Sequence, residues 1–409
     1  MLTVIACVPT TVPARAAAAS ALTRSRTLVG RLLIAHGDNF ATGAMVMQTG
    51  LRTASGYVRL TLPVSQHART LALAGASVRV QGTLSSNSFT VSQVSPLPDP
   101  RAVARPAGWV RSPQVMRIAV VLMRLPGSST APASKAAVKR STFGAKRSVA
   151  DWYSQTSGKH VVVTGTVFGI YTGVRSCDLG VQLSAAAAAA AKGGYVASDF
   201  DHLVVVEPEQ SCGFSGIGWV GQNGVFLNGD ATPGVMEHEL GHNLGLWHAG
   251  AYSCPASAVS AACLTEYGDP TDVMGSPYLD HGYNAEHKRR IGWIPATEVR
   301  TVVAGTQTIT LTASEDPVVL GAIELIHLRA ADGTIYSIDK RASIGYDAGL
   351  SGVWIRRLSA TNTVDTALVR NSAYTPGTTF TDAVHRVTIK TLSDSGPAAK
   401  VRVCVGACR

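Results

Sequence analysis

The chain has 409 residues, of which 46% are hydrophobic and 15% are charged, and its formal net charge is +10 at pH 7. This length suggests two or three domains, each large enough for its own core. The scarcity of charge and the abundance of Gly, Ala, Ser, Thr and Val favour a β-rich, secreted architecture over a long helical bundle. No apolar run is long enough to form a transmembrane segment.

Residues 1–26 are expected to be a leader or an unstructured segment. Leu2 to Val8 is apolar and Ala16 to Ala19 offers small residues for cleavage, although a basic start and a longer apolar core are not evident. Val4 to Cys7 resembles a bacterial lipoprotein box, which makes Cys7 a candidate lipid anchor. Two interpretations therefore stay open: a secreted extracellular protein, and a periplasmic or surface lipoprotein.

Residues 27–98 are expected to form a small β-domain, with an OB-like fold and a prodomain role as candidates. Short β-branched or alternating runs separated by Gly, Asn and Ser indicate its strands. Prolines mark a linker at 99–113. From Arg101 to Ser148 there are ten Lys or Arg and no acid, but no nucleic-acid motif. We therefore expect a solvated surface, open to trypsin-like cutting, and no nucleic-acid partner.

Residues 114–296 are expected to form one α/β or α+β domain with a twisted mixed sheet and a helix below it. Buried runs and helical patterns alternate along this segment. The expected strands are Val115 to Leu125, Val161 to Phe168 and His202 to Val206, and the expected helices are Val138 to Thr156, Leu179 to Lys192 and Met236 to Gly245.

Residues 297–409 return to short strands separated by turn residues, at a spacing typical of a β-sandwich. The expected strands are Gln307 to Thr312, Ile323 to Arg329, Ile335 to Ile338, Gly352 to Leu358, Val387 to Leu392 and Lys400 to Val405. We expect a C-terminal sandwich domain of unassigned role.

The most informative motif is HELGHNLGLWH, at residues 238–248. On a helix, His238 and His242 lie one turn apart on one face, so both imidazoles can bind a single Zn²⁺. Gly245 lies where a helix can end in a left-handed residue, and the chain can then return His248 as a third ligand. Scattered histidines usually cap or pack, but a chance match to the whole pattern is rare. The motif predicts one catalytic zinc ion.

Glu239 lies beside these ligands and could reach a water in the open fourth position of the metal. It would take the proton as this water attacks a peptide carbonyl, and then pass the proton to the leaving amine. The alternative for Glu239 is a carboxylate on the helix surface. Its place inside the motif favours the role of general base.

The motif is followed at residues 267–275 by YGDPTDVMG. Together the two segments resemble the metzincin metallopeptidases, and Met274 matches the methionine of their turn beneath the zinc. More narrowly, residues 110–295 resemble the gametolysin-like family, peptidase M11. This resemblance implies a metzincin-like fold and an endopeptidase acting on extracellular or cell-wall glycoproteins. From composition alone, Met274 would be an ordinary core residue.

Other side chains near this turn are weaker candidates. Tyr278 could donate a hydrogen bond to the oxyanion, although a core or loop tyrosine is the favoured alternative. Solvent-facing roles are favoured for His281 and His287 because three zinc ligands are already found. Asp269 and Asp272 are expected to hold the turn through bonds to the backbone, so structural calcium is not indicated.

Seven cysteines indicate an oxidising compartment. Setting Cys7 aside, six cysteines allow fifteen pairings, so connectivity stays open. Pairing of near neighbours is the simplest choice: Cys177 with Cys212, Cys254 with Cys263, and Cys404 with Cys408.

The sequence therefore predicts a secreted zinc endopeptidase, expected to be a monomer, that acts on proteins or peptides, glycoproteins included. Two alternatives stay open. One is a catalytically inactive adhesive or carbohydrate-binding protein on a peptidase scaffold. The other is a zinc amidase directed at peptidoglycan. Side-chain specificity, the activation route and any latency mechanism cannot be identified from the sequence.

Overall fold

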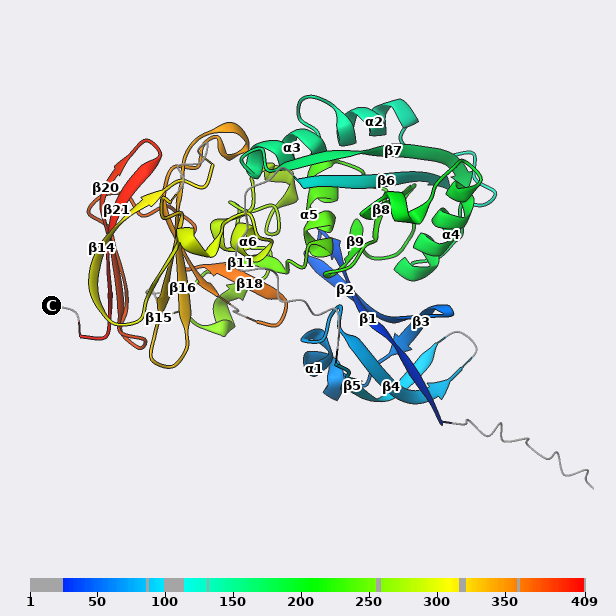
Figure 1. The fold of residues 1–409 in the computed structure, drawn as a ribbon, viewed down its shortest axis with the longest axis horizontal. Coiled ribbons are helices and arrows are strands. Elements are labelled where there is room, and N and C mark those ends of the chain that lie inside the picture. Colours follow the sequence, from blue (N-terminus) through cyan, green and yellow to red (C-terminus); the bar gives the residue numbers. More distant parts are fainter. Residues whose placement is uncertain are drawn as a thin grey trace, which may run out of the picture.

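The computed structural model describes residues 25–407 apart from 86–87, 99–113, 131, 255–258, 316–320 and 359–360. The expectations for Cys7, for the linker at 99–113 and for the leader up to residue 24 lie outside the described residues, whereas Ser25 and Arg26 already belong to the first strand. Within the described part, mixed β-sheets dominate and helices are few (Figure 1). No described helix combines the length and apolarity needed to cross a bilayer.

The N-terminal part is a closed barrel of five strands. The barrel closes because β1 pairs with both β2 and β4, in the circular order β1-β2-β3-β5-β4. Its interior holds apolar side chains that include Leu32, Leu51 and Phe89. Its elements are β1 (Ser25–Asn39), β2 (Ala44–Thr53), β3 (Gly56–Thr61), α1 (His67–Leu71), β4 (Ser77–Leu84) and β5 (Phe89–Pro96).

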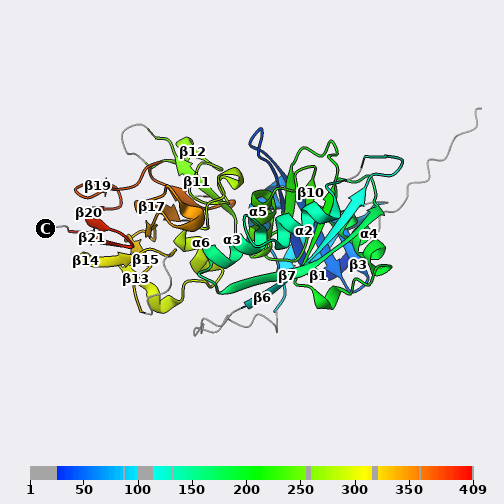
Figure 2. The same ribbon diagram turned by 90° about the horizontal axis from the view of Figure 1, so that it is seen from above.

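The middle part continues the same sheet in the order β1-β9-β10-β8-β6-β7. Helices α2, α3 and α5 pack on one face of it, and the alanine-rich α4 covers the other (Figures 1 and 2). The elements are β6 (Gln114–Arg124), α2 (Lys135–Phe143), α3 (Val149–Thr156), β7 (Val161–Thr172), α4 (Leu179–Ala191), β8 (His202–Glu207), β9 (Gly216–Trp219), β10 (Val225–Asn228) and α5 (Pro233–Asn243).

The single helix expected at 138–156 is wrong. Two helices replace it because Gly144 ends α2 in an extended conformation, and the Ser148 hydroxyl caps α3 by accepting from the Asp151 N–H at 3.1 Å.

The C-terminal part contains a seven-stranded sheet, in the order β12-β11-β18-β17-β16-β15-β13, and a four-stranded sheet, β14-β21-β20-β19, which share one apolar core. The seven-stranded sheet takes strands from both sides of residue 297. Its elements are β11 (His248–Tyr252), β12 (Leu264–Thr265), β13 (Val299–Val302), β15 (Leu325–Arg329), β16 (Ile335–Arg341), β17 (Gly352–Leu358) and β18 (Val364–Leu368). The remaining elements are α6 (Ala285–Arg290), β14 (Gly305–Thr312), β19 (Thr379–Asp382), β20 (Val387–Ser395) and β21 (Ala398–Val405).

Both disulfide bonds whose two cysteines lie in the described part of the chain are Cys177–Cys212 and Cys254–Cys263. Both are the near-neighbour pairings expected from the sequence. The first ties the segment before α4 to the loop between β8 and β9, and the second closes the loop after β11. The expected partner of Cys404, which is Cys408, lies outside the described residues.

Candidate functional site

Helix α5 carries the first half of the motif and is buried along its length. Pro233 occupies its first turn, where the missing N–H costs nothing. Gly245 has a φ of 95°, and its N–H donates to the His242 carbonyl at 2.8 Å, so the helix stops and the chain turns back. His248 then begins β11. The glycine therefore has the turning role that the motif spacing predicts.

The three histidine rings meet at one point and are fully buried, each with 0% exposure. Ring centroids are 4.9 Å apart for His238 and His242, 5.5 Å for His238 and His248, and 5.2 Å for His242 and His248. The turn at Gly245 thus brings the start of β11 back to the helix that carries the other two histidines.

Each of these rings is held by a hydrogen bond at its Nδ1 atom. Because a backbone carbonyl can only accept, the Nδ1 atoms of His238 and His242 carry the protons, and their Nε2 lone pairs point into the cluster. The bonds run from His238 to the Val273 carbonyl at 2.9 Å, from His242 to the Leu246 carbonyl at 2.9 Å, and from His248 to the Glu266 carboxylate at 2.8 Å.

At the centre of the three Nε2 atoms lies the carboxylate of Asp38, from β1. One of its oxygens is 3.2 Å from the Nε2 of both His238 and His242, and the other is 3.1 Å from that of His248. Nitrogen lone pairs and carboxylate oxygens repel each other unless a proton or a metal cation lies between them. Imidazole nitrogens with an added carboxylate are a donor set that suits Zn²⁺. The residues present therefore fit the metal that the motif implies.

The electrostatics of the cluster follow from burial and from this carboxylate. Burial lowers the pKa of His238 to about 4, although Asp38 opposes the shift. Burial acts in the same direction on His248, but Asp38 and Glu266 raise its pKa to about 9. The pKa of Asp38 would rise on burial, yet the surrounding histidines hold it well below its usual range. The cluster thus keeps a carboxylate ionised where no solvent reaches it.

Glu239 lies beside the cluster with 0% exposure, and neither of its carboxylate oxygens has a hydrogen-bond partner among the described residues. Its carboxylate, the Asp38 carboxylate and a His238 ring nitrogen lie within 4.8 Å of one another. Burial and the Asp38 charge raise the pKa of Glu239 well above its ordinary range. Glycines on β9 make room for this side chain, since a Cβ at Gly216 would lie 2.4 Å from a Glu239 oxygen.

The predicted methionine turn packs against the helix. Met274 is fully buried, and a Cβ at Gly241, between the two helical histidines, would lie 2.4 Å from its sulfur. Asp272 accepts from the Met274 N–H and the Asn284 N–H, both at 2.7 Å. Asp269 likewise accepts from the Thr271 N–H at 2.9 Å. Both aspartates therefore stabilise the turn through the backbone, as expected.

The other candidates have hydrogen-bond partners outside the histidine cluster. The Tyr278 side chain is 55% exposed, and its hydroxyl donates to Asp230 at 2.8 Å. The Nδ1 of His287 lies 2.9 Å from a carboxylate oxygen of Asp272, and that of His281 lies 2.9 Å from the Tyr346 carbonyl. His287 is buried, not solvent-facing, because α6 packs it against the methionine turn.

Four contributors were missed by the sequence reasoning: His36, Asp38, Glu266 and Tyr267. The Tyr267 hydroxyl donates to Asp38, and its ring centroid lies 4.3 Å from that of His248. Glu266 and Tyr267 immediately precede and open the methionine-turn segment, which was a usable signal. Asp38 had a compositional signal, because it is the only acid in residues 1–98.

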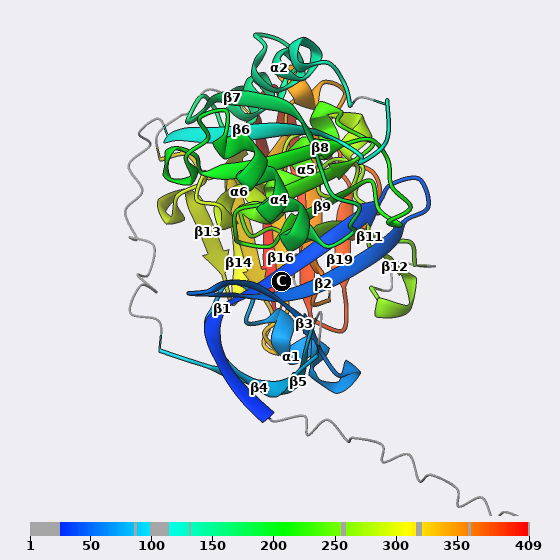
Figure 3. The ribbon, with the colours of Figure 1, turned by 90° about the vertical axis from the view of Figure 1, so that its right-hand side faces the viewer.

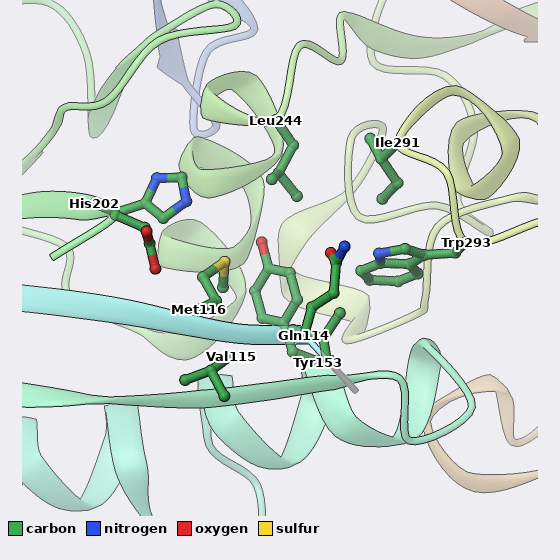
Figure 4. Close-up of a pocket in the computed structure, with 10 residues that line it drawn as sticks. Gln114, Val115, Met116, Tyr153, His202, Leu244, Ile291 and Trp293 are labelled. Carbon is green, nitrogen blue, oxygen red and sulfur yellow. The ribbon is translucent and has the colours of Figure 1, made fainter. Parts of the chain in front are cut away.

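A separate pocket of about 430 Å³ lies near the C-terminal end of α5. Figure 4 shows Tyr153, His202, Leu244 and Trp293 around it. None of its lining residues belongs to the histidine cluster, so this pocket is not the candidate metal centre.

Comparisons with known proteins identify the family. A solved chain titled "Structure of a chaperone-substrate complex" is 14% identical with a TM-score of 0.24, over 45% of this chain and 33% of that chain, and at this TM-score it carries no argument. No curated protein matches significantly. The model of the gametolysin peptidase M11 family matches residues 119–328, more than half of the sequence, which confirms the predicted resemblance. The chain belongs to the gametolysin peptidase M11 family.

Proposed function

We propose that this peptidase is a secreted, zinc-dependent endopeptidase. The Nε2 atoms of His238, His242 and His248 would hold one Zn²⁺. The observation that carries this proposal is the convergence of three buried imidazoles whose Nδ1 atoms are already bonded. Such bonds fix each ring and its tautomer before a metal arrives, as in known zinc sites.

The bound zinc would act as a Lewis acid that polarises the substrate carbonyl and lowers the pKa of a bound water towards neutrality. Glu239 would accept the proton of the attacking water and return it to the leaving amine. Its unbonded carboxylate and the space left by Gly216 support this role. Met274 would support the helix from below. Tyr278 remains the candidate oxyanion donor, which requires its hydroxyl to leave Asp230.

The architecture supports the finer parts of the proposal. The barrel order β1-β2-β3-β5-β4, with α1 between β3 and β4, favours an OB-like N-terminal domain over residues 27–98. The sheet and zinc helix of residues 114–296 favour a metzincin-like peptidase domain. The two packed sheets favour a sandwich for residues 297–409.

The proposed substrates are extracellular or cell-wall proteins, glycoproteins included. Family membership supports a protein substrate. The two disulfides fit an extracellular location, because such bonds persist in oxidising compartments. We propose that the protein acts as a monomer.

The test measures metal and cleavage separately. The full chain should contain about one zinc per molecule, as three histidine ligands require. Before and after limited trypsin digestion, it is incubated with a denatured protein and a broad peptide library. Glu239→Ala should keep the zinc and lose cleavage. Zinc binding without any peptide cleavage would overturn the proposal in favour of a binding protein. Cleavage confined to peptidoglycan stem peptides would overturn it in favour of an amidase.

A further inference from the structure

The N-terminal barrel contributes one negative charge to the proposed metal site. This charge is unusual because the barrel segment is otherwise basic. Residues 1–98 contain eight arginines and one acid, Asp38. Most acids lie on protein surfaces, because an ionised carboxylate loses several kcal/mol of hydration when it is buried. Asp38 is nevertheless 0% exposed, and it lies at the metal site of a different part of the chain.

The contacts of Asp38 hold its carboxylate at the centre of the cluster. The Tyr267 hydroxyl donates to one oxygen, and the Nδ1 of His36 lies 2.9 Å from the same oxygen. The Nε2 atoms of His238 and His242 lie 3.2 Å from one oxygen, and that of His248 lies 3.1 Å from the other. Tyr267 and His36 orient the carboxylate toward the imidazoles, as hydrogen-bond partners of a metal ligand do.

The backbone of β1 explains how this side chain arrives there. Residues Ala35 to Asp38 pair antiparallel with β9, and Asp38 lies opposite Gly216. Side chains alternate along a strand, so His36 and Asp38 point toward α5 while Leu33 and Ala35 join the core under α4. Figure 3 shows β1 and β2 running from the barrel alongside β9. A one-residue slip of this register would turn Asp38 away from the histidines.

The hairpin formed by β1 and β2 also covers the site. The Phe40 ring, just beyond β1, stacks edge-on against His238 with centroids 4.9 Å apart. The three candidate ligands and Glu239 all have 0% exposure. Because β1 pairs with β9, an extended peptide cannot reach Glu239 along that edge while the hairpin is in place.

Further contacts dock the barrel against α4. The Gln48 side chain donates to the Cys177 carbonyl at 2.5 Å and accepts from the Leu179 N–H at 2.9 Å. The Tyr57 hydroxyl donates to Asp178 at 3.2 Å. These bonds satisfy polar groups at the start of α4. The barrel therefore docks at a specific place on the peptidase domain.

We propose that Asp38 is a fourth ligand of the metal and that the β1–β2 hairpin keeps the intact chain latent. The inference rests on the proposed function, because the metal is held by the same three histidines. The barrel is then an inhibitory prodomain. Cleavage between the barrel and β6, where Arg101, Arg105 and Arg111 lie in the sequence, would cut its covalent link.

The experiment uses the zinc-loaded full chain and acetohydroxamate, a small chelator that needs free coordination positions on zinc. Calorimetric titration compares the wild type with Asp38→Ala. If the open form of the wild type is populated at about 1%, the variant should bind acetohydroxamate about 100-fold more tightly. Met45→Ala is the matched control, because Met45 is the cross-strand partner of Asp38 and its side chain is exposed. This control should bind like the wild type.

Two further measurements make the result independent of any one variant. Asp38→Asn, which preserves the shape of the side chain, should bind zinc at least about tenfold more weakly than the wild type in a competition with a chelator. Wild type that has been cut by trypsin and then separated from the barrel should gain acetohydroxamate binding without any substitution.

The outcomes separate this inference from the proposed function. Equal acetohydroxamate binding by the wild type, Asp38→Ala and the cut chain would overturn the latency, even if all of them cleave peptides. Gain of binding by the variant and the cut chain supports the latency, even if no form cleaves a peptide and the peptidase proposal fails.

Discussion

Replacing Arg356 tests how far the proposed metal site depends on the C-terminal part. Arg356 lies in β17 and has 0% exposure. Its Nε donates to Asp269 at 2.7 Å, its Nη1 to Asp339 at 2.5 Å, and its Nη2 to the Thr271 hydroxyl at 2.6 Å. Since Asp269 and Thr271 belong to the methionine-turn segment, one guanidinium fixes this segment to the seven-stranded sheet.

Arg356→Met keeps most of the side-chain volume but leaves two carboxylates buried without their cation. Breaking a buried pair from one side costs about 3–5 kcal/mol of unfolding free energy. We expect a value in the lower half of this range, because Arg341 also acts on Asp339. For a domain of this size the midpoint of thermal unfolding should fall by roughly 6–15 °C.

Thermal unfolding measures the loss of stability, and zinc titration measures how far the proposed metal site depends on Arg356. The double variant Arg356→Met/Asp269→Asn should recover part of the lost unfolding free energy, because it removes one of the two unpaired buried charges. Arg357→Met is the neighbouring control, and its partly exposed side chain should contribute less than about 1 kcal/mol. A loss below about 1 kcal/mol for Arg356→Met would refute the view that this buried network holds the turn.

Three further changes test other parts of the site. Gly216→Ala places a methyl group 2.4 Å from a Glu239 oxygen. The peptidase rate of the trypsin-cut chain should therefore fall at least about tenfold with zinc content unchanged. An unaltered rate would contradict the view that Gly216 makes room for Glu239. Tyr278→Phe should lower kcat by roughly 10²-fold with little change in KM if this residue stabilises the oxyanion, and equal kcat would remove it from the mechanism. Burial raises the pKa of Glu207 to about 7, above its unfolded value, so its contribution to stability is present below about pH 4.5 and is lost as the pH rises through 7. Glu207→Gln should therefore show a smaller fall in the midpoint of thermal unfolding between pH 4.5 and pH 8 than the wild type. Parallel plots of midpoint against pH for the two proteins would contradict the raised pKa of Glu207.

The histidine motif was predictable because its geometry is local. Two histidines four residues apart on a helix, a glycine that ends the helix, and a third histidine three residues later form a pattern that needs no knowledge of the rest of the chain. The longer strands of the middle and C-terminal parts were also found within a few residues, since buried β-branched runs have a clear pattern. Short strands such as β11 and β18 were missed because they have five residues and no alternation.

The role of Asp38 could not be predicted from local pattern. It meets His242 across 204 positions of sequence, and nothing in its own neighbourhood resembles a metal-binding motif. A single acid in an otherwise basic domain was a hint that it has a partner elsewhere, but the partner is defined only by the pairing of β1 with β9. Long-range strand pairing depends on the whole sheet, and sequence periodicity does not specify it.

The third candidate ligand shows why the C-terminal part is structurally inseparable from the candidate metal centre. His248 begins β11, which pairs with β18, and its N–H donates to the Thr363 carbonyl at 3.0 Å. The neighbouring Trp247 N–H donates to Asp365 at 2.8 Å. Without these strands, the segment after Gly245 would lose the partners that return His248 to the other two rings. The motif therefore specifies the candidate ligands, whereas contacts with a segment more than 100 residues later hold the third one in position.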